Sequence, residues 1–179
     1  MASKNTDNSS AGDILLIKEL SPYLGYTRAQ LKWALEEAKH GGMAVESLLE
    51  RAISIQGKIK RSNKDGEDFI DGSDAKKVTL SRNSKSDNSL SCHISNLKNK
   101  KGILRVAVSD PFRNKVHYFK IPHSLYVGRK TINLSFSHKS LDGMPNIKEK
   151  TNSKSFSAMV WQYYKCDSFE ELCRPVKWK

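Results

Sequence analysis

Apolar residues in the first third of the chain recur at the spacing of two amphipathic helices. The first stripe, at residues 31–38, follows the capping-box pattern of Thr27–Gln30 and stops at a pair of glycines. The second stripe, at residues 45–53, gathers Val, Leu, Ala and Ile on one face and leaves Glu46 and Glu50 on the polar side. The pattern therefore predicts two helices that share one apolar core.

Upstream of these helices the apolar pattern is shorter. Residues 13–20 carry enough apolar positions for a short helix. We expect it to end before Pro22, because the residue that precedes a proline disfavours helical geometry. Residues 1–12 are polar and predict a disordered tail.

Beyond Asn63 the apolar spacing changes from helical to the alternation of β-strands. We expect strands at residues 68–70, 75–80, 90–97, 103–108, 115–121 and 131–136, a loop at 140–153, and helices at 156–164 and 168–173. The order of helices, strands and helices predicts an α/β fold with a central mixed sheet flanked by helices. Residues 13–179 then form a single domain, with a helical part at 13–62 and a sheet core with C-terminal helices at 63–179.

Composition narrows the setting in which such a domain works. Hydrophobic residues make up 37% of the chain, which suffices for a modest core. No apolar run approaches the roughly 20 residues that a membrane span needs. The three cysteines lack the spacing of a disulfide framework, which favours a reducing compartment. We therefore expect a protein of the bacterial cytoplasm that does not associate with membranes.

The charge of the chain is large and unevenly distributed. The formal net charge is +12, which points to a polyanionic partner, and nucleic acid is the best candidate. Residues 1–75 hold 10 basic and 12 acidic side chains, a net of −2, whereas residues 76–179 hold 21 and 7, a net of +14. The basic surplus therefore lies entirely in the sheet-forming part.

Five acidic residues stand just before this basic part, in a segment of ten positions. They are Asp65, Glu67, Asp68, Asp71 and Asp74. A surface that only binds DNA has no use for them, because each carboxylate repels phosphate. Hard divalent cations resolve the conflict, since they bind carboxylate oxygens and bridge them to phosphate. The sequence thus predicts a Mg²⁺ site.

Asp74 and Lys76 are the strongest candidates for catalytic residues. They lie two positions apart at the start of a predicted strand, so alternation places both side chains on one face. The carboxylate would hold Mg²⁺, and the amine would orient or deprotonate the attacking water in phosphodiester hydrolysis. The second acid is open among Asp71, Asp68, Glu67 and, from the helix, Glu46.

Asp74-Ala75-Lys76 after an acid-rich turn resembles the motif of the PD-(D/E)xK nucleases, the superfamily of most type II restriction enzymes. The helix with Glu46, the hairpin of 103–121 and the segment at 167–172 are also similar to small restriction endonucleases, so the likeness covers about residues 44–173. The resemblance implies a restriction-endonuclease-like fold and a Mg²⁺-dependent cut of double-stranded DNA by a homodimer. The chain departs from the family pattern in having no Pro-Asp dipeptide before the motif.

Basic residues in the second part are candidates for DNA contacts. Lysine and arginine bind phosphates and guanine edges, and asparagine prefers adenine. The candidates are Lys98, Lys100, Lys101, Arg105, Arg113, Arg129, Lys130, Lys139 and Asn146. A rival hypothesis is a non-catalytic DNA-binding protein of phage or bacterial origin. It explains the charge equally well but leaves the acidic segment without a purpose.

Overall fold

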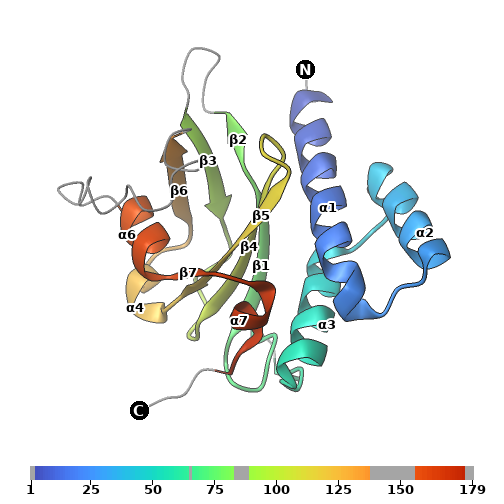
Figure 1. The fold of residues 1–179 in the computed structure, drawn as a ribbon. Coiled ribbons are helices and arrows are strands. Elements are labelled where there is room, and N and C mark those ends of the chain that lie inside the picture. Colours follow the sequence, from blue (N-terminus) through green and yellow to red (C-terminus); the bar gives the residue numbers. More distant parts are fainter. Residues whose placement is uncertain (1–2, 65, 83–88, 138–155, 176–179) are drawn as a thin grey trace.

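Helices and two β-sheets form a layered arrangement, shown in Figure 1 as a computed structural model that describes residues 3–64, 66–82, 89–137 and 156–175. The helices are α1 (Ser3–Leu24), α2 (Arg28–Lys39), α3 (Val45–Gly57), α4 (His123–Tyr126), α6 (Phe156–Tyr163) and α7 (Phe169–Cys173). The strands are β1 (Asp74–Thr79), β2 (Ser81–Arg82), β3 (Ser89–Ile94), β4 (Leu104–Asp110), β5 (Lys115–Ile121), β6 (Ile132–Ser137) and β7 (Lys165–Cys166). The α/β prediction is confirmed.

The larger sheet is mixed, as expected, and has the strand order β1-β4-β5-β7. Strand β1 runs parallel to β4, whereas the pairs β4–β5 and β5–β7 are antiparallel. The remaining strands form a separate antiparallel sheet of order β2-β3-β6, where one central sheet was expected. Leu80, a fully buried residue, separates β1 of the larger sheet from β2 of the smaller one. In the strand order, β1 lies at one end of the larger sheet.

Two apolar clusters cover the opposite faces of the larger sheet. On one face, Ala75, Ala107 and Tyr118 pack in one cluster with buried residues of α1, α3 and α7. On the other face, Val106 and Phe119 pack with residues of β3, β6 and α6. Figure 1 shows α1 and α3 alongside the sheet and α2 outermost, against α1. Alternation along β1 thus decides which side chains face the helices and which face the second sheet.

The first helix is longer at both ends than the sequence indicated. Helix α1 begins at Ser3, inside the segment 1–12 that was expected to be a tail, and continues through Pro22 to Leu24. A proline lacks the N–H that would bond to the carbonyl of Lys18. The hydroxyl of Ser21 donates a hydrogen bond to that carbonyl at 3.1 Å, so the missing donor is replaced locally.

The other elements lie close to their predicted positions, with two exceptions. The capping box of Thr27 and Gln30 is present at the start of α2, as predicted. The expected strand at 68–70 is reduced to an isolated bridge between Arg61 and Phe69. The expected loop at 140–153 lies outside the described residues. Within the described ranges, no helix has the length and apolar character that crossing a membrane requires.

A close approach of two backbone segments fixes the start of β1. A Cβ atom added to Gly102, just before β4, would lie 1.8 Å from the carbonyl oxygen of Gly72 in the turn before β1. The hydroxyl of Tyr126, on α4, donates a hydrogen bond to the carbonyl of Gly102 from the other side. The segment before β4 is therefore held against the turn that leads to Asp74.

We predict that Gly102→Ala lowers the free energy of unfolding by at least about 1–3 kcal/mol. The added methyl group would clash with the backbone carbonyl of Gly72, which cannot move away as a flexible side chain can. Gly42→Ala is the matched control, since its nearest neighbour is the flexible end of the Glu37 side chain. Urea unfolding of both variants measures the difference. Equal stability of the two variants would contradict the close approach.

Candidate functional site

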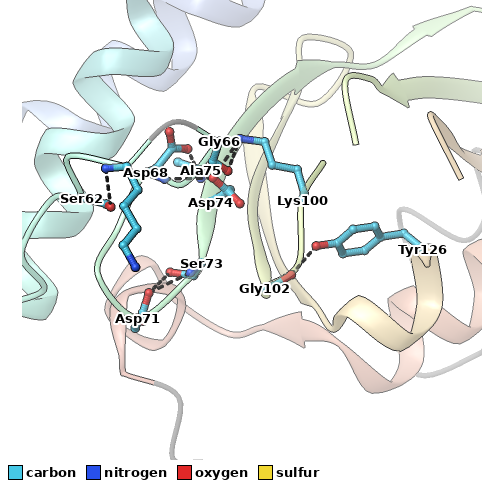
Figure 2. A network of polar contacts seen from close by, with 11 residues as sticks. Ser62, Gly66, Asp68, Asp71, Ser73, Asp74, Ala75, Lys100, Gly102 and Tyr126 are labelled. Atoms are coloured by element: carbon cyan, nitrogen blue, oxygen red, sulfur yellow. Dashed lines mark hydrogen bonds and ion pairs between the residues drawn. The ribbon is translucent and has the colours of Figure 1, made fainter. Parts of the chain in front are cut away.

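The carboxylate of Asp74 is the buried centre of the site (Figure 2). Its side chain is fully shielded from solvent at the first position of β1. Oxygen Oδ1 accepts hydrogen bonds from the backbone N–H of Asp68 at 2.9 Å and from the ammonium of Lys100 at 3.0 Å. Among the described residues, oxygen Oδ2 has no hydrogen-bond partner. Burial raises the pKa of Asp74, and the hydrogen bond from Lys100 opposes that rise.

Asp68 and Asp74 hold one another's backbone in place. While the N–H of Asp68 donates to Asp74, oxygen Oδ2 of Asp68 accepts the N–H of Ala75 at 2.8 Å. That N–H belongs to the outer edge of β1, because the neighbouring N–H of Asp74 donates inward to Ile103. The completely buried ring of Phe69 fixes the intervening turn in the core. The carboxylates of both aspartates are thus brought to the same end of β1.

Glu50 of helix α3 lies beside Asp68. Its carboxyl group is hydrogen-bonded to that of Asp68, and Arg61 donates to it at 2.9 Å. Burial and the hydrogen bond to Asp68 raise the pKa of Glu50 to about 7. Two carboxyl groups can form such a bond only while one of them keeps its proton. At neutral pH Glu50 therefore lies close to the point at which it loses its proton.

Lys100 supplies the positive charge beside Asp74. Its ammonium also donates to the carbonyl of Gly66 at 3.1 Å, and only 15% of the side chain is exposed. The sequence predicts this residue as a DNA contact. The structure instead directs it inward, onto the carboxylate that the sequence marked as catalytic, and Figure 2 shows the two side chains meeting.

Lys76 lies on the same face of β1 as Asp74, as alternation predicts. It is partly buried, and within the described part of the chain no hydrogen bond or ion pair of its ammonium is found. The neighbouring Lys77 points to the opposite face, where it forms an ion pair with Asp13 of α1 at 2.7 Å. Asp74 and Lys76 therefore share a face of β1, as expected. The amine that contacts Asp74, however, belongs to Lys100 in the loop before β4.

Asp71 is not part of the carboxylate group around Asp74. Its Oδ1 accepts hydrogen bonds from the backbone and hydroxyl of Ser73, and its Oδ2 pairs with Arg105 at 3.1 Å. Although burial raises its pKa, these donors hold that pKa below the usual value. The structure thus gives Asp71 a role in the turn and in an ion pair, instead of the predicted catalytic and metal-binding role.

The prediction that Arg105 contacts DNA is wrong, because its side chain is completely buried. The guanidinium donates to Ser73 at 3.0 Å and to the backbone carbonyls of Leu172 and Arg174 at the C-terminal end of α7. A planar group with five N–H donors suits this set of acceptors. Arg105 therefore ties α7 to the turn before β1 and has no free face for a ligand.

Glu46 and Glu67 are the remaining acidic candidates. Glu46 stands one turn before Glu50 on α3, and its charge contributes to the raised pKa of Glu50. Glu67 is partly buried, and among the described residues its carboxylate has no recorded partner. The sequence-based prediction named Glu46, and not Glu50, as a possible second acid, although both lie on the polar face of the same helix. The i, i+4 spacing of the two was the signal that Glu50 was an equal candidate.

Four of the predicted DNA-binding residues are exposed on two loops that touch each other. Lys98 and Lys101 flank Lys100, while Arg129 and Lys130 precede β6. The backbone N–H of Leu97 donates to the carbonyl of Lys130 at 3.0 Å and connects the loops. Arg129 also lies over the ring of Phe156, 5.3 Å from its centroid. This set of exposed cations is here called the basic loops.

The other predicted DNA contacts differ from these four. Arg113 is largely buried and pairs with Asp110 at 3.4 Å in the β4–β5 connection. Lys139 and Asn146 lie outside the described residues. Of the basic loops, the one with Lys98 and Lys101 also carries Lys100, and the loop with Arg129 and Lys130 is joined to it through Leu97.

Carboxylate oxygens are the ligands that Mg²⁺ prefers, and Asp74, Asp68 and Glu50 offer only such oxygens. In the described ranges, no three side chains of His, Cys, Asp or Glu already surround an ion position. Mg²⁺ is usually held by one or two carboxylates together with waters and substrate phosphates. The unpartnered Oδ2 of Asp74 and its neighbour Asp68 therefore suit a cation that shares its ligands with a substrate.

No family model matches this chain, and no curated protein or solved structure is significantly similar to it.

We predict that Glu50→Gln changes how stability depends on pH. In the wild type, the folded state keeps a proton that the unfolded state has lost, so stability falls as pH rises from 4.5 to about 7. The glutamine stays neutral, so its stability relative to the wild type should grow between about pH 5 and about pH 8. Urea unfolding across this range tests it, with Glu36→Gln as a surface control. If the free energies of unfolding of wild type and Glu50→Gln depend on pH in the same way, the proton shared by Glu50 and Asp68 is contradicted.

We predict that Arg105→Met lowers the free energy of unfolding by about 3–5 kcal/mol, because it leaves Asp71 and two carbonyls without their donor. Arg129→Met, at an exposed position, should cost less than about 0.5 kcal/mol. Chemical denaturation of both variants makes the comparison. A loss at position 105 as small as that at position 129 would show that the buried guanidinium is not needed for stability.

Proposed function

We propose that this protein is a Mg²⁺-dependent endonuclease that hydrolyses phosphodiester bonds of double-stranded DNA. The observation that carries the proposal is the buried, half-satisfied carboxylate of Asp74, which has Asp68 and Lys100 beside it, with Glu50 next to Asp68. A purely structural aspartate would have both oxygens satisfied, because burying an unpaired polar atom is unfavourable. An open oxygen beside other carboxylates is the arrangement that a divalent cation completes.

The residues of this group divide the chemical work between them. Asp74 and Asp68 would hold the cation, which when bound polarises the phosphate oxygens, while Glu50 adds a third carboxylate as its proton leaves. An amine near Asp74, from Lys76 or Lys100, would orient the attacking water and balance the charge at phosphorus. The water oxygen forms a bond to phosphorus, the bond to the leaving ester oxygen breaks, and the proton from water ends on that oxygen.

The basic loops support DNA as the substrate. Lys98, Lys101, Arg129 and Lys130 are exposed next to a site that is itself acidic. Exposed lysine and arginine attract the phosphate backbone without reading sequence. A strand held by these loops would bring its phosphates toward Asp74, since Lys100 belongs to the same loop. Cutting both strands of a duplex requires two such sites, so we propose a homodimer with two-fold symmetry.

A non-catalytic DNA-binding protein is the second candidate. It is favoured by the finding that, in the described residues, no three ligands already surround an ion position. Incubation of a plasmid with and without Mg²⁺ separates the two functions. Discrete fragments that require Mg²⁺ support the endonuclease, whereas a gel shift without nicks supports the binding protein.

We predict that Asp74→Asn abolishes Mg²⁺-dependent plasmid cleavage and leaves DNA affinity within about twofold of wild type, because the amide keeps the shape but loses the anionic ligand. Asp167→Asn, at an exposed position before α7, is the matched control and should cleave normally. Cleavage is followed on a supercoiled plasmid, and affinity by fluorescence anisotropy in Ca²⁺. Cleavage by Asp74→Asn at the wild-type rate would remove the proposed site.

A further inference from the structure

Two lysines are close enough in sequence or space to serve the carboxylate group, and the structure distinguishes them. Lys76 shares a face of β1 with Asp74, but two residues along a strand separate their Cα atoms by about 6–7 Å. The ammonium of Lys100 lies 3.0 Å from an oxygen of Asp74, although 26 positions separate the two residues. The contact with the carboxylate is thus made by the lysine that the acid-x-lysine pattern does not include.

The backbone that carries Lys100 is held at both ends. On its N-terminal side, the N–H of Lys100 bonds to the carbonyl of Leu97 at 3.1 Å, and Leu97 is itself buried. On its C-terminal side, Gly102 packs directly against the carbonyl of Gly72 and receives the hydroxyl of Tyr126. Figure 2 shows Gly102, Tyr126 and Lys100 around the start of β1. The ammonium therefore reaches Asp74 from a fixed position.

The second acceptor of Lys100 adds to this arrangement. Its ammonium bonds to the carbonyl of Gly66, in the segment that leads to Asp68. One amine thus connects the two stretches of chain that carry the aspartates. By occupying Oδ1 of Asp74, it leaves Oδ2 as the oxygen without a partner.

We infer that Lys100, rather than Lys76, is the amine of this site, and that it positions Asp74 so that Oδ2 faces a divalent cation; the inference rests on the proposed endonuclease function. Lys100 then has two opposing effects. It keeps the carboxylate oriented for the reaction, and its positive charge weakens cation binding through repulsion. A lysine that only stabilised the fold would not produce both effects.

The test compares Lys100→Met with Lys76→Met, and uses Lys32→Met on α2 as a surface control. Ca²⁺ binding to the full chain without DNA is measured by calorimetry. We expect Lys100→Met to bind Ca²⁺ about tenfold more tightly than wild type at alkaline pH, where protons do not compete for Asp74, because a cation 3.0 Å from the ligand has been removed. Lys76→Met should change this affinity less. An affinity of Lys100→Met equal to or below that of wild type overturns the inference.

Plasmid cleavage in Mg²⁺ gives the second measurement. We expect Lys100→Met to lower kcat about a hundredfold with little change in KM, and the loss to exceed that of Lys76→Met. Lys100→Arg should recover part of kcat, since it returns the charge with a different shape. Thermal unfolding of each variant verifies that it is folded at the assay temperature. Normal cleavage by folded Lys100→Met, or a greater loss in Lys76→Met, overturns the inference.

The two measurements also separate the inference from the proposed function. If the wild-type protein does not cleave DNA under any Mg²⁺ concentration, the endonuclease proposal fails. The calorimetric comparison still decides whether Lys100 lies beside a cation site at Asp74, because it needs no substrate.

Discussion

The burial of one carboxylate organises this molecule. Asp74 begins the end strand of the larger sheet and is withdrawn from water, so its charge must be balanced by the protein. The balance comes from the backbone N–H of Asp68 and the ammonium of Lys100, both on oxygen Oδ1. The turn at Phe69, the close contact at Gly102 and the pairing of Asp68 with Ala75 all bring these partners to their positions. Among the described residues, oxygen Oδ2 remains without a partner, and the proposed cation would bind there.

Two buried cations divide the structural and chemical tasks. Arg105 occupies the helix-covered side of the sheet, where it connects the turn before β1 to the end of α7 through Asp71 and backbone carbonyls. Lys100 approaches Asp74 from the loop before β4. The planar guanidinium serves many fixed acceptors, while the compact ammonium neutralises one carboxylate. The acidic segment before β1 can therefore provide Asp71 for stability, and Asp68 and Asp74 for the proposed site.

Hydrophobic periodicity predicted these helices and strands because each of them depends mainly on residues that are close in sequence. Alternation placed strand β5 at its observed bounds and β1 and β4 within one or two residues, since each buries a defined face. The first turns of α1 were missed because their residues are polar and give no stripe. Asp74 was predicted as a site residue from the acidic segment before a basic region and from its spacing to Lys76 on a strand. Lys100 was not, because its contact with Asp74 depends on the approach of Gly102 to Gly72, which no periodicity encodes.

Three lysines on one loop connect the site to its surroundings. Lys98 and Lys101 face solvent, whereas Lys100 between them turns inward to Asp74. A polyanion attracted by the outer lysines would meet a group of carboxylates that repels it, so the outer charges alone cannot bring a phosphate to Asp74. A divalent cation removes that conflict, because it binds carboxylate and phosphate oxygens alike. The arrangement of this loop is thus more economically explained by cation-assisted chemistry on a nucleic acid than by binding alone.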